Sequence, residues 1–124
     1  MPIERITGFN QSSRSNTPEH HHIQFKFVVI EGPDGMGYVC LGDGQQHTAI
    51  FSRFLRYLEE NGIDANGFKH RGGGHYSFEP AGKKTKLTFF GTSQYLGEFD
   101  RNLLEETLEE CLDKEKFEYE IGEN

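Results

Sequence analysis

The sequence predicts an α+β (mixed α/β) fold in which two helices pack on a mixed sheet of about six strands. The chain has 124 residues, which is the length of a single domain. Two segments repeat apolar residues at helical spacing, and six shorter segments are rich in β-branched and aromatic residues. These segments follow one another in the order β-β-α-β-β-β-α-β, which is typical of helices packed on one sheet.

The first two predicted strands form a hairpin. QFKFVVIEG at 24–32 and GYVCLG at 37–42 carry the β-branched and aromatic residues of strands. The intervening PDGMG has the proline and glycines of a turn. IERITGF, at 3–9, is a weaker candidate for one more strand.

A helix is predicted within GDGQQHTAIFSRFLRYLEENG, residues 42–62. Asp43 and Gln46 have the spacing of a capping box at its start, and Gly62 suits the left-handed conformation that ends a helix. His47 would then lie in the first helical turn, outside the apolar stripe. That stripe consists of Ile50, Phe51, Phe54, Leu55 and Leu58.

Three strands are predicted after this helix, at 66–70, 75–80 and 84–91, with RGGG and AGKK as the turns between them. The segment GTSQYLGEFD has the composition of a loop. Asp100 would cap a second helix that ends near residue 113, and KFEYEIG would form the last strand. The apolar face of that helix consists of Leu103, Leu104, Leu108, Cys111 and Leu112.

The polar N-terminal region lacks any periodic pattern over residues 10–22. We therefore expect a flexible arm over 1–23 and one folded domain over 24–122. Three consecutive histidines in the arm, 20–22, resemble a metal-binding tract, although histidines in a polar arm need bind nothing specific.

Charge and composition exclude several classes of protein. The formal net charge of −7 argues against general nucleic-acid binding, and no apolar run is long enough to span a membrane. Cys40 and Cys111 match no zinc spacing, which favours reduced thiols in a cytoplasmic protein and leaves a disulfide between them open. The 69–86 segment carries five Lys or Arg and one acid, so it would either attract a small anion or form solvated hairpin residues.

Two single residues are candidates for chemistry. His47 lies where a helix start presents unpaired N–H groups, a position suited to phosphoryl chemistry, although an ordinary polar residue would also fit there. Lys26 interrupts an apolar strand on the face of Val28 and Ile30, where it must reach water or meet an anion. The GTSQYLG loop could turn several backbone N–H groups toward an oxyanion.

Several segments together resemble the phosphohistidine phosphatase family, also called the Janus/ocnus family. FKFVVI, QQHTAIFSRF, GGG-x-x-S, KKTKLTFFGTSQYLG and FEYEI occur in that order between Phe25 and Ile121. The resemblance implies a metal-independent phosphatase, without cofactor, that hydrolyses phosphohistidine (a phosphoramidate) in proteins. It also implies a monomer whose partners are phosphorylated proteins or small phosphoramidates, and neither nucleic acid nor membrane.

The same resemblance assigns roles to residues at matching positions. It makes His47 the catalytic residue, as general base or as nucleophile, and Lys26 a ligand of the phosphoryl oxygens. Backbone N–H groups of the loop at Ser93, Gln94 and Tyr95, the Ser93 side chain and the Thr48 N–H would complete the phosphate site.

The chain departs from the family pattern next to the histidine, at Gln46 and Ala49, and after the three glycines, at His75. These departures motivate an alternative function, a non-catalytic phosphate- or phosphopeptide-binding module of the same fold.

Overall fold

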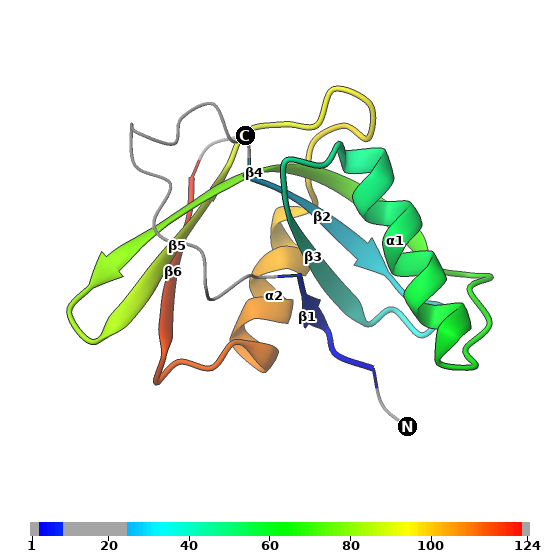
Figure 1. The fold of residues 1–124 in the computed structure, drawn as a ribbon, viewed down its shortest axis with the longest axis horizontal. Coiled ribbons are helices and arrows are strands. Elements are labelled where there is room, and N and C mark those ends of the chain that lie inside the picture. The colour runs from blue at the N-terminus through cyan, green and yellow to red at the C-terminus, as the bar shows by residue number, and fades with distance from the viewer. Residues whose placement is uncertain (1–2, 9–24, 123–124) are drawn as a thin grey trace.

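The computed structural model describes residues 3–8 and 25–122. Six strands form one mixed sheet in the order β1-β3-β2-β4-β5-β6, with the outer pairs β1–β3 and β5–β6 parallel and the inner pairs antiparallel (Figure 1). The elements are β1 (Ile6–Thr7), β2 (Phe25–Glu31), β3 (Gly37–Asp43), α1 (His47–Glu60), β4 (Lys69–Ala81), β5 (Lys84–Phe90), α2 (Arg101–Cys111) and β6 (Phe117–Ile121). The predicted α+β domain of six strands and two helices is confirmed.

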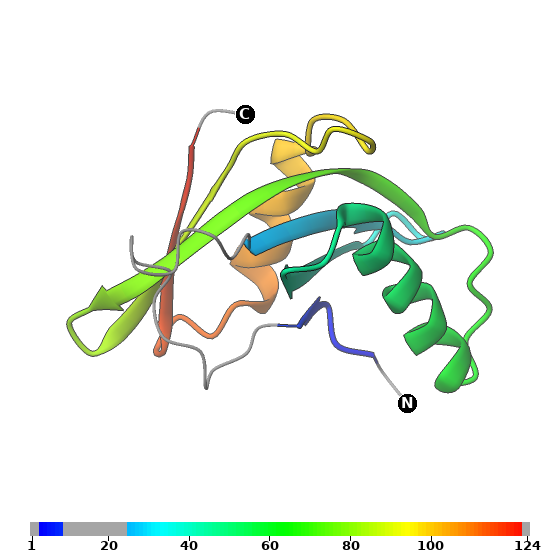
Figure 2. The same ribbon diagram turned by 45° about the horizontal axis from the view of Figure 1, so that its top comes forward.

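The two helices cover opposite faces of the sheet, as the two views in Figures 1 and 2 agree. Side chains alternate between faces along a strand, so neighbouring residues of β2 enter different cores. The core beneath α1 includes Val28, Ile30, Tyr38, Cys40, Ile50, Phe54 and Leu58. The core beneath α2 includes Phe25, Phe27, Val29, Val39, Leu41, Phe89, Leu104 and Leu108. Lys26 alternates with Phe25 and Phe27 and therefore lies on the α1 face, as predicted.

The start of α1 differs from the prediction. The N-cap is Gln46, whose side chain makes no capping hydrogen bond, and Asp43 is the last residue of β3. The predicted capping box is therefore wrong, because β3 continues one residue further and leaves only three residues before the helix. The helix end is as predicted, with Asn61 as C-cap and Gly62 in the left-handed region at a φ of 73°.

Strand β4 corrects the prediction of two strands joined by an RGGG turn. It runs unbroken over Lys69–Ala81 and crosses the sheet, and the three glycines 72–74 are buried inside it. The register with β2 shifts between Val28 and Ile30, and Gly72 adopts a φ of 79° at this bulge. A side chain at Gly72 would also meet the carbonyl oxygen of Glu98. Glycine therefore serves close chain packing here, and not a hairpin turn.

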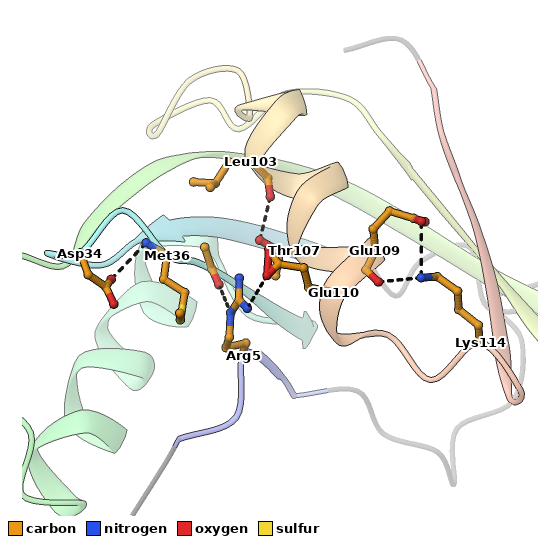
Figure 3. A network of polar contacts seen from close by, with 9 residues as sticks. Arg5, Asp34, Met36, Leu103, Thr107, Glu109, Glu110 and Lys114 are labelled. Carbon is orange, nitrogen blue, oxygen red and sulfur yellow. Dashed lines mark hydrogen bonds and ion pairs between the residues drawn. The ribbon is translucent and has the colours of Figure 1, made fainter.

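Helix α2 is anchored both to the sheet and to the N-terminal strand. Asp100 caps it, as predicted, by accepting a hydrogen bond from the Leu103 N–H at 3.0 Å. Arg5 donates to the carbonyl oxygen of Gly37 at 2.8 Å and forms an ion pair with Glu110 at 3.2 Å (Figure 3). Residues 3–8 thus belong to the folded unit although they fall within the predicted 1–23 arm.

Both cysteines are unpaired, Cys40 in the α1 core and Cys111 on the surface. The predicted apolar face of α2 is therefore wrong at Cys111, and the buried polar residue Thr107 takes part in that face instead. The Thr107 hydroxyl is satisfied inside the helix because it donates to the carbonyl oxygen of Leu103 at 2.7 Å. No helix in the described residues is long and apolar enough to cross a membrane.

Candidate functional site

A pocket of about 360 Å³ opens where four parts of the chain meet. These parts are the start of β2, the N-terminus of α1, the middle of β4 and the loop that follows β5. The pocket is lined by Lys26, Gln46, His47, His75, Thr92, Gln94 and Tyr95. Three of these side chains are basic and none is a carboxylate, in a protein whose net charge is −7.

The loop at 91–100 reaches the pocket because it replaces β5 along part of β4. Strand β5 pairs with β4 only from His75 onward. Before that point, the loop supplies hydrogen bonds to β4. The Ser93 N–H donates to the Gly73 carbonyl at 2.9 Å, and the Asp100 N–H donates to the Arg71 carbonyl at 2.9 Å. These bonds hold the Thr92–Tyr95 segment beside the middle of β4.

Lys26 and His75 are cross-strand neighbours in the β2–β4 pair. Directly opposite residues of an antiparallel pair share one face of the sheet. Both residues therefore rise from the sheet on the α1 side and line the same pocket. This pairing could not be predicted from the sequence, because the two residues lie 49 positions apart.

His47 is almost completely buried, with a relative exposure of 5%. Its Nε2 atom lies 2.7 Å from the carbonyl oxygen of Gly74. A carbonyl oxygen only accepts, so Nε2 carries the proton, and the lone pair of the neutral ring is on Nδ1. The expectation that His47 lies outside the buried face of α1 is wrong, because His47, Ile50 and Phe54 recur on one side of the helix.

The ring of His47 needs the absence of a side chain at Gly73. A Cβ at that position would lie 2.9 Å from His47 Cδ2 and 2.5 Å from the carbonyl oxygen of Phe27. Gly91 performs a similar role for His75, whose Nδ1 would lie 2.9 Å from an added Cβ. Glycines thus provide the space that both imidazole rings occupy.

The two imidazole rings lie close together, with centroids 5.7 Å apart and planes at 82°. Burial lowers the pKa of His47, and the positive charge of Lys26 lowers it further, whereas the bond to Gly74 opposes the shift. Burial also lowers the pKa of His75, with smaller contributions from His47 and Lys26. Both rings are therefore predominantly neutral near pH 7 while the pocket is empty.

The structure brings four of the six predicted site residues together in the pocket: Lys26, His47, Gln94 and Tyr95. Thr48 is exposed on α1 and does not line it. Ser93 is buried within the loop, and its hydroxyl oxygen accepts a hydrogen bond from the Leu96 N–H at 3.0 Å. Tyr95 is 70% exposed and stands at the rim.

Three further lining residues were not predicted as site residues: Gln46, His75 and Thr92. Gln46 and Thr92 are next to predicted site residues in the sequence, and this adjacency could have identified them as lining residues. His75 stood out as a departure from the family pattern and as part of the basic 69–86 segment. Its position opposite Lys26 depends on the strand pairing, which the misplaced RGGG turn concealed.

Within residues 3–8 and 25–122, no group of three or more His, Cys, Asp or Glu side chains is placed to hold a metal ion. The three histidines at 20–22 fall outside the described residues.

Comparisons with known proteins give no family assignment. No protein-family model matches the chain, and no curated protein matches it.

Proposed function

We propose that this chain is a metal-independent phosphatase that hydrolyses phosphohistidine in proteins. The observation that carries the proposal is the composition of the pocket. Lys26 brings a positive charge to it, and none of the described residues that line it is a carboxylate, so its electrostatic potential favours an anion. The ordered resemblance of five segments to the phosphohistidine phosphatase family supports the same conclusion.

In the proposed reaction, Lys26 pairs with the phosphoryl oxygens, and N–H groups at the start of α1 and in the 91–100 loop stabilise the charge that develops on them. His47 Nδ1 takes a proton from water as the water oxygen attacks phosphorus. The phosphorus–nitrogen bond breaks, and the departing nitrogen takes the proton that His47 Nδ1 accepted from water, which returns the ring to its neutral form. The lowered pKa of His47 favours this role, because the ring is neutral and able to accept a proton near pH 7.

A non-catalytic phosphate- or phosphopeptide-binding module is the second candidate. It is favoured by the position of Ser93, whose hydroxyl faces Leu96 inside the loop, so that a predicted phosphate ligand does not line the pocket. A binding module would need the basic pocket, but it would not need a general base placed to take a proton from water.

Hydrolysis and binding measured on the same preparation separate the two candidates. The full chain would be incubated with phosphohistidine and with phosphoramidate in EDTA, and released phosphate would be measured. Phosphate binding would be followed by NMR. We expect both turnover and binding. Binding without turnover would support the module, and turnover that requires added Mg²⁺ or Mn²⁺ would refute the metal-independent mechanism.

The proposed partners are phosphorylated proteins or small phosphoramidates, and we propose a cytoplasmic monomer. The two unpaired cysteines support a reducing compartment. The acidic net charge supports a partner other than nucleic acid.

A further inference from the structure

His75 occupies a position in the pocket that a permanently charged residue could have filled. Its ring lies against Phe90, its cross-strand partner on β5, with centroids 6.1 Å apart and planes at 28°. The opposite neighbour on β2 is Lys26. Packing against Phe90 and Gly91 fixes where the ring stands, and among the described residues no hydrogen bond involves either of its nitrogens.

Among the described residues, the charged and titratable groups around His75 are potential cations, apart from one tyrosine. Strand β2 contributes Lys26, helix α1 contributes His47, and the loop contributes Tyr95 at the pocket rim. Strand β5 contributes Phe90, which has no charge. Without an anion, burial opposes a proton on His75, and the positive charge of Lys26 opposes it further.

A tetrahedral dianion in the pocket reverses this balance. An opposite charge within about 4–6 Å of an imidazole raises its pKa by about 1–3 units. We infer that His75 takes up a proton from solution when a phosphoryl dianion binds, so that the pocket gains its second full positive charge only together with its ligand. The inference rests on the proposed phosphate-binding role of the pocket. It states that one proton is taken up for each dianion that binds.

Proton uptake has consequences that a fixed arginine would not have. Between the pKa of His75 in the free protein and its higher pKa in the complex, dianion affinity should fall by up to about tenfold per pH unit, and above the pKa in the complex it should level off. The empty pocket carries less charge and less repulsion between Lys26 and His75. The acquired proton also lies beside the phosphoryl group, where the departing nitrogen of a phosphoramidate needs one.

The test uses sulfate, a tetrahedral dianion that does not itself titrate near neutral pH. The histidine Hε1 resonances of the full chain would be followed by NMR from about pH 5 to 9, in sulfate and in chloride of matched ionic strength. The resonances would be assigned with His75→Gln, His47→Gln and His70→Gln. We expect sulfate to raise the midpoint of His75 by about one pH unit or more, and to leave exposed His70 on the same strand unchanged.

A second measurement uses His75→Arg, which fixes the charge at this position. Sulfate affinity should depend on pH in the wild type and be nearly constant in this variant over the same range. An unchanged His75 midpoint, or a sulfate effect confined to His47, would overturn the inference. A raised midpoint in a protein without turnover would support the inference and refute the proposed hydrolysis, so the two proposals fail separately.

Discussion

The side chain of His47 ties helix α1 to strand β4, because its Nε2–H donates to the carbonyl oxygen of Gly74 at 2.7 Å. The bond fixes the ring within the wall of the pocket and leaves the Nδ1 lone pair as the basic atom. His47 therefore has both a structural role and a proposed chemical role. Variants at this position must be measured for stability and for turnover separately.

His47→Ala should lower the free energy of unfolding, contrary to expectation from the helical stripe alone. The substitution removes a buried ring and leaves the Gly74 carbonyl without its partner, at a cost of about 1–3 kcal/mol. Urea unfolding would measure the change. His70→Ala is the control, since His70 is exposed on β4, makes one ring contact with Phe51 and should cost less. A His47→Ala protein as stable as the wild type would show that the His47 bond contributes nothing.

Lys26→Met should weaken phosphate binding and leave stability almost unchanged. The methionine keeps most of the aliphatic stem but removes the charge contact, which is worth about 1.5–3 kcal/mol, or roughly 10- to 100-fold in affinity. Phosphate titration by NMR measures the affinity. Lys84→Met, at the exposed start of β5, is the control for a general change in charge. If both variants bind phosphate like the wild type, Lys26 does not belong to the site.

Gly73→Ala should damage both the fold and the site. The added methyl would lie 2.5 Å from the Phe27 carbonyl oxygen and 2.9 Å from His47 Cδ2, so β2 or the imidazole must move. Overpacking of this kind costs about 1–3 kcal/mol. Gly122→Ala is the matched control, because its nearest contact would be an ordinary 3.6 Å. A Gly73→Ala protein with wild-type stability and an unshifted His47 resonance would contradict the packing described here.

Acidification should destabilise the protein in a window set by His47 and His75. Burial holds both folded-state pKa values below the ordinary value of about 6.5, so the unfolded chain binds more protons in this range. The free energy of unfolding should therefore fall as the pH drops through about 6.5, and level off below the folded-state values. The pKa of Glu109 is lowered by the Tyr119 hydroxyl, which places its effect at lower pH.

Urea unfolding at about pH 7.5 and 5 measures this loss of stability. A variant carrying both His47→Gln and His75→Gln should lose less stability between these pH values than the wild type does. The same loss in both proteins would assign the effect to other groups.

The two helices could be predicted from the sequence because their signals are local. The stripe of α1 from Ile50 to Leu58 and the Asp100 cap of α2 depend on residues within a few positions of one another. Strand β4 could not be predicted because its glycines imitate a turn. Gly72 and Gly73 are required by the 91–100 loop and by His47, and both contacts join segments far apart in the chain.

The candidate site was predictable only in part, for the same reason. Lys26 and His47 each stood out locally, as a charge in an apolar strand and a histidine at a helix start. His75 becomes a site residue only through the register that pairs it with Lys26. The hydroxyl of Ser93 is directed by a turn within its own loop, which composition alone does not reveal.

Phosphate release from phosphohistidine in EDTA, compared between wild type, His47→Gln and His70→Gln, tests the central claim most directly. Glutamine retains a donor for the Gly74 carbonyl but cannot exchange a proton near neutral pH. We predict that His47→Gln loses about 100-fold or more of the wild-type turnover while remaining folded, and that His70→Gln keeps all of it. Turnover of His47→Gln within threefold of the wild type would contradict the assignment of His47 as the catalytic residue.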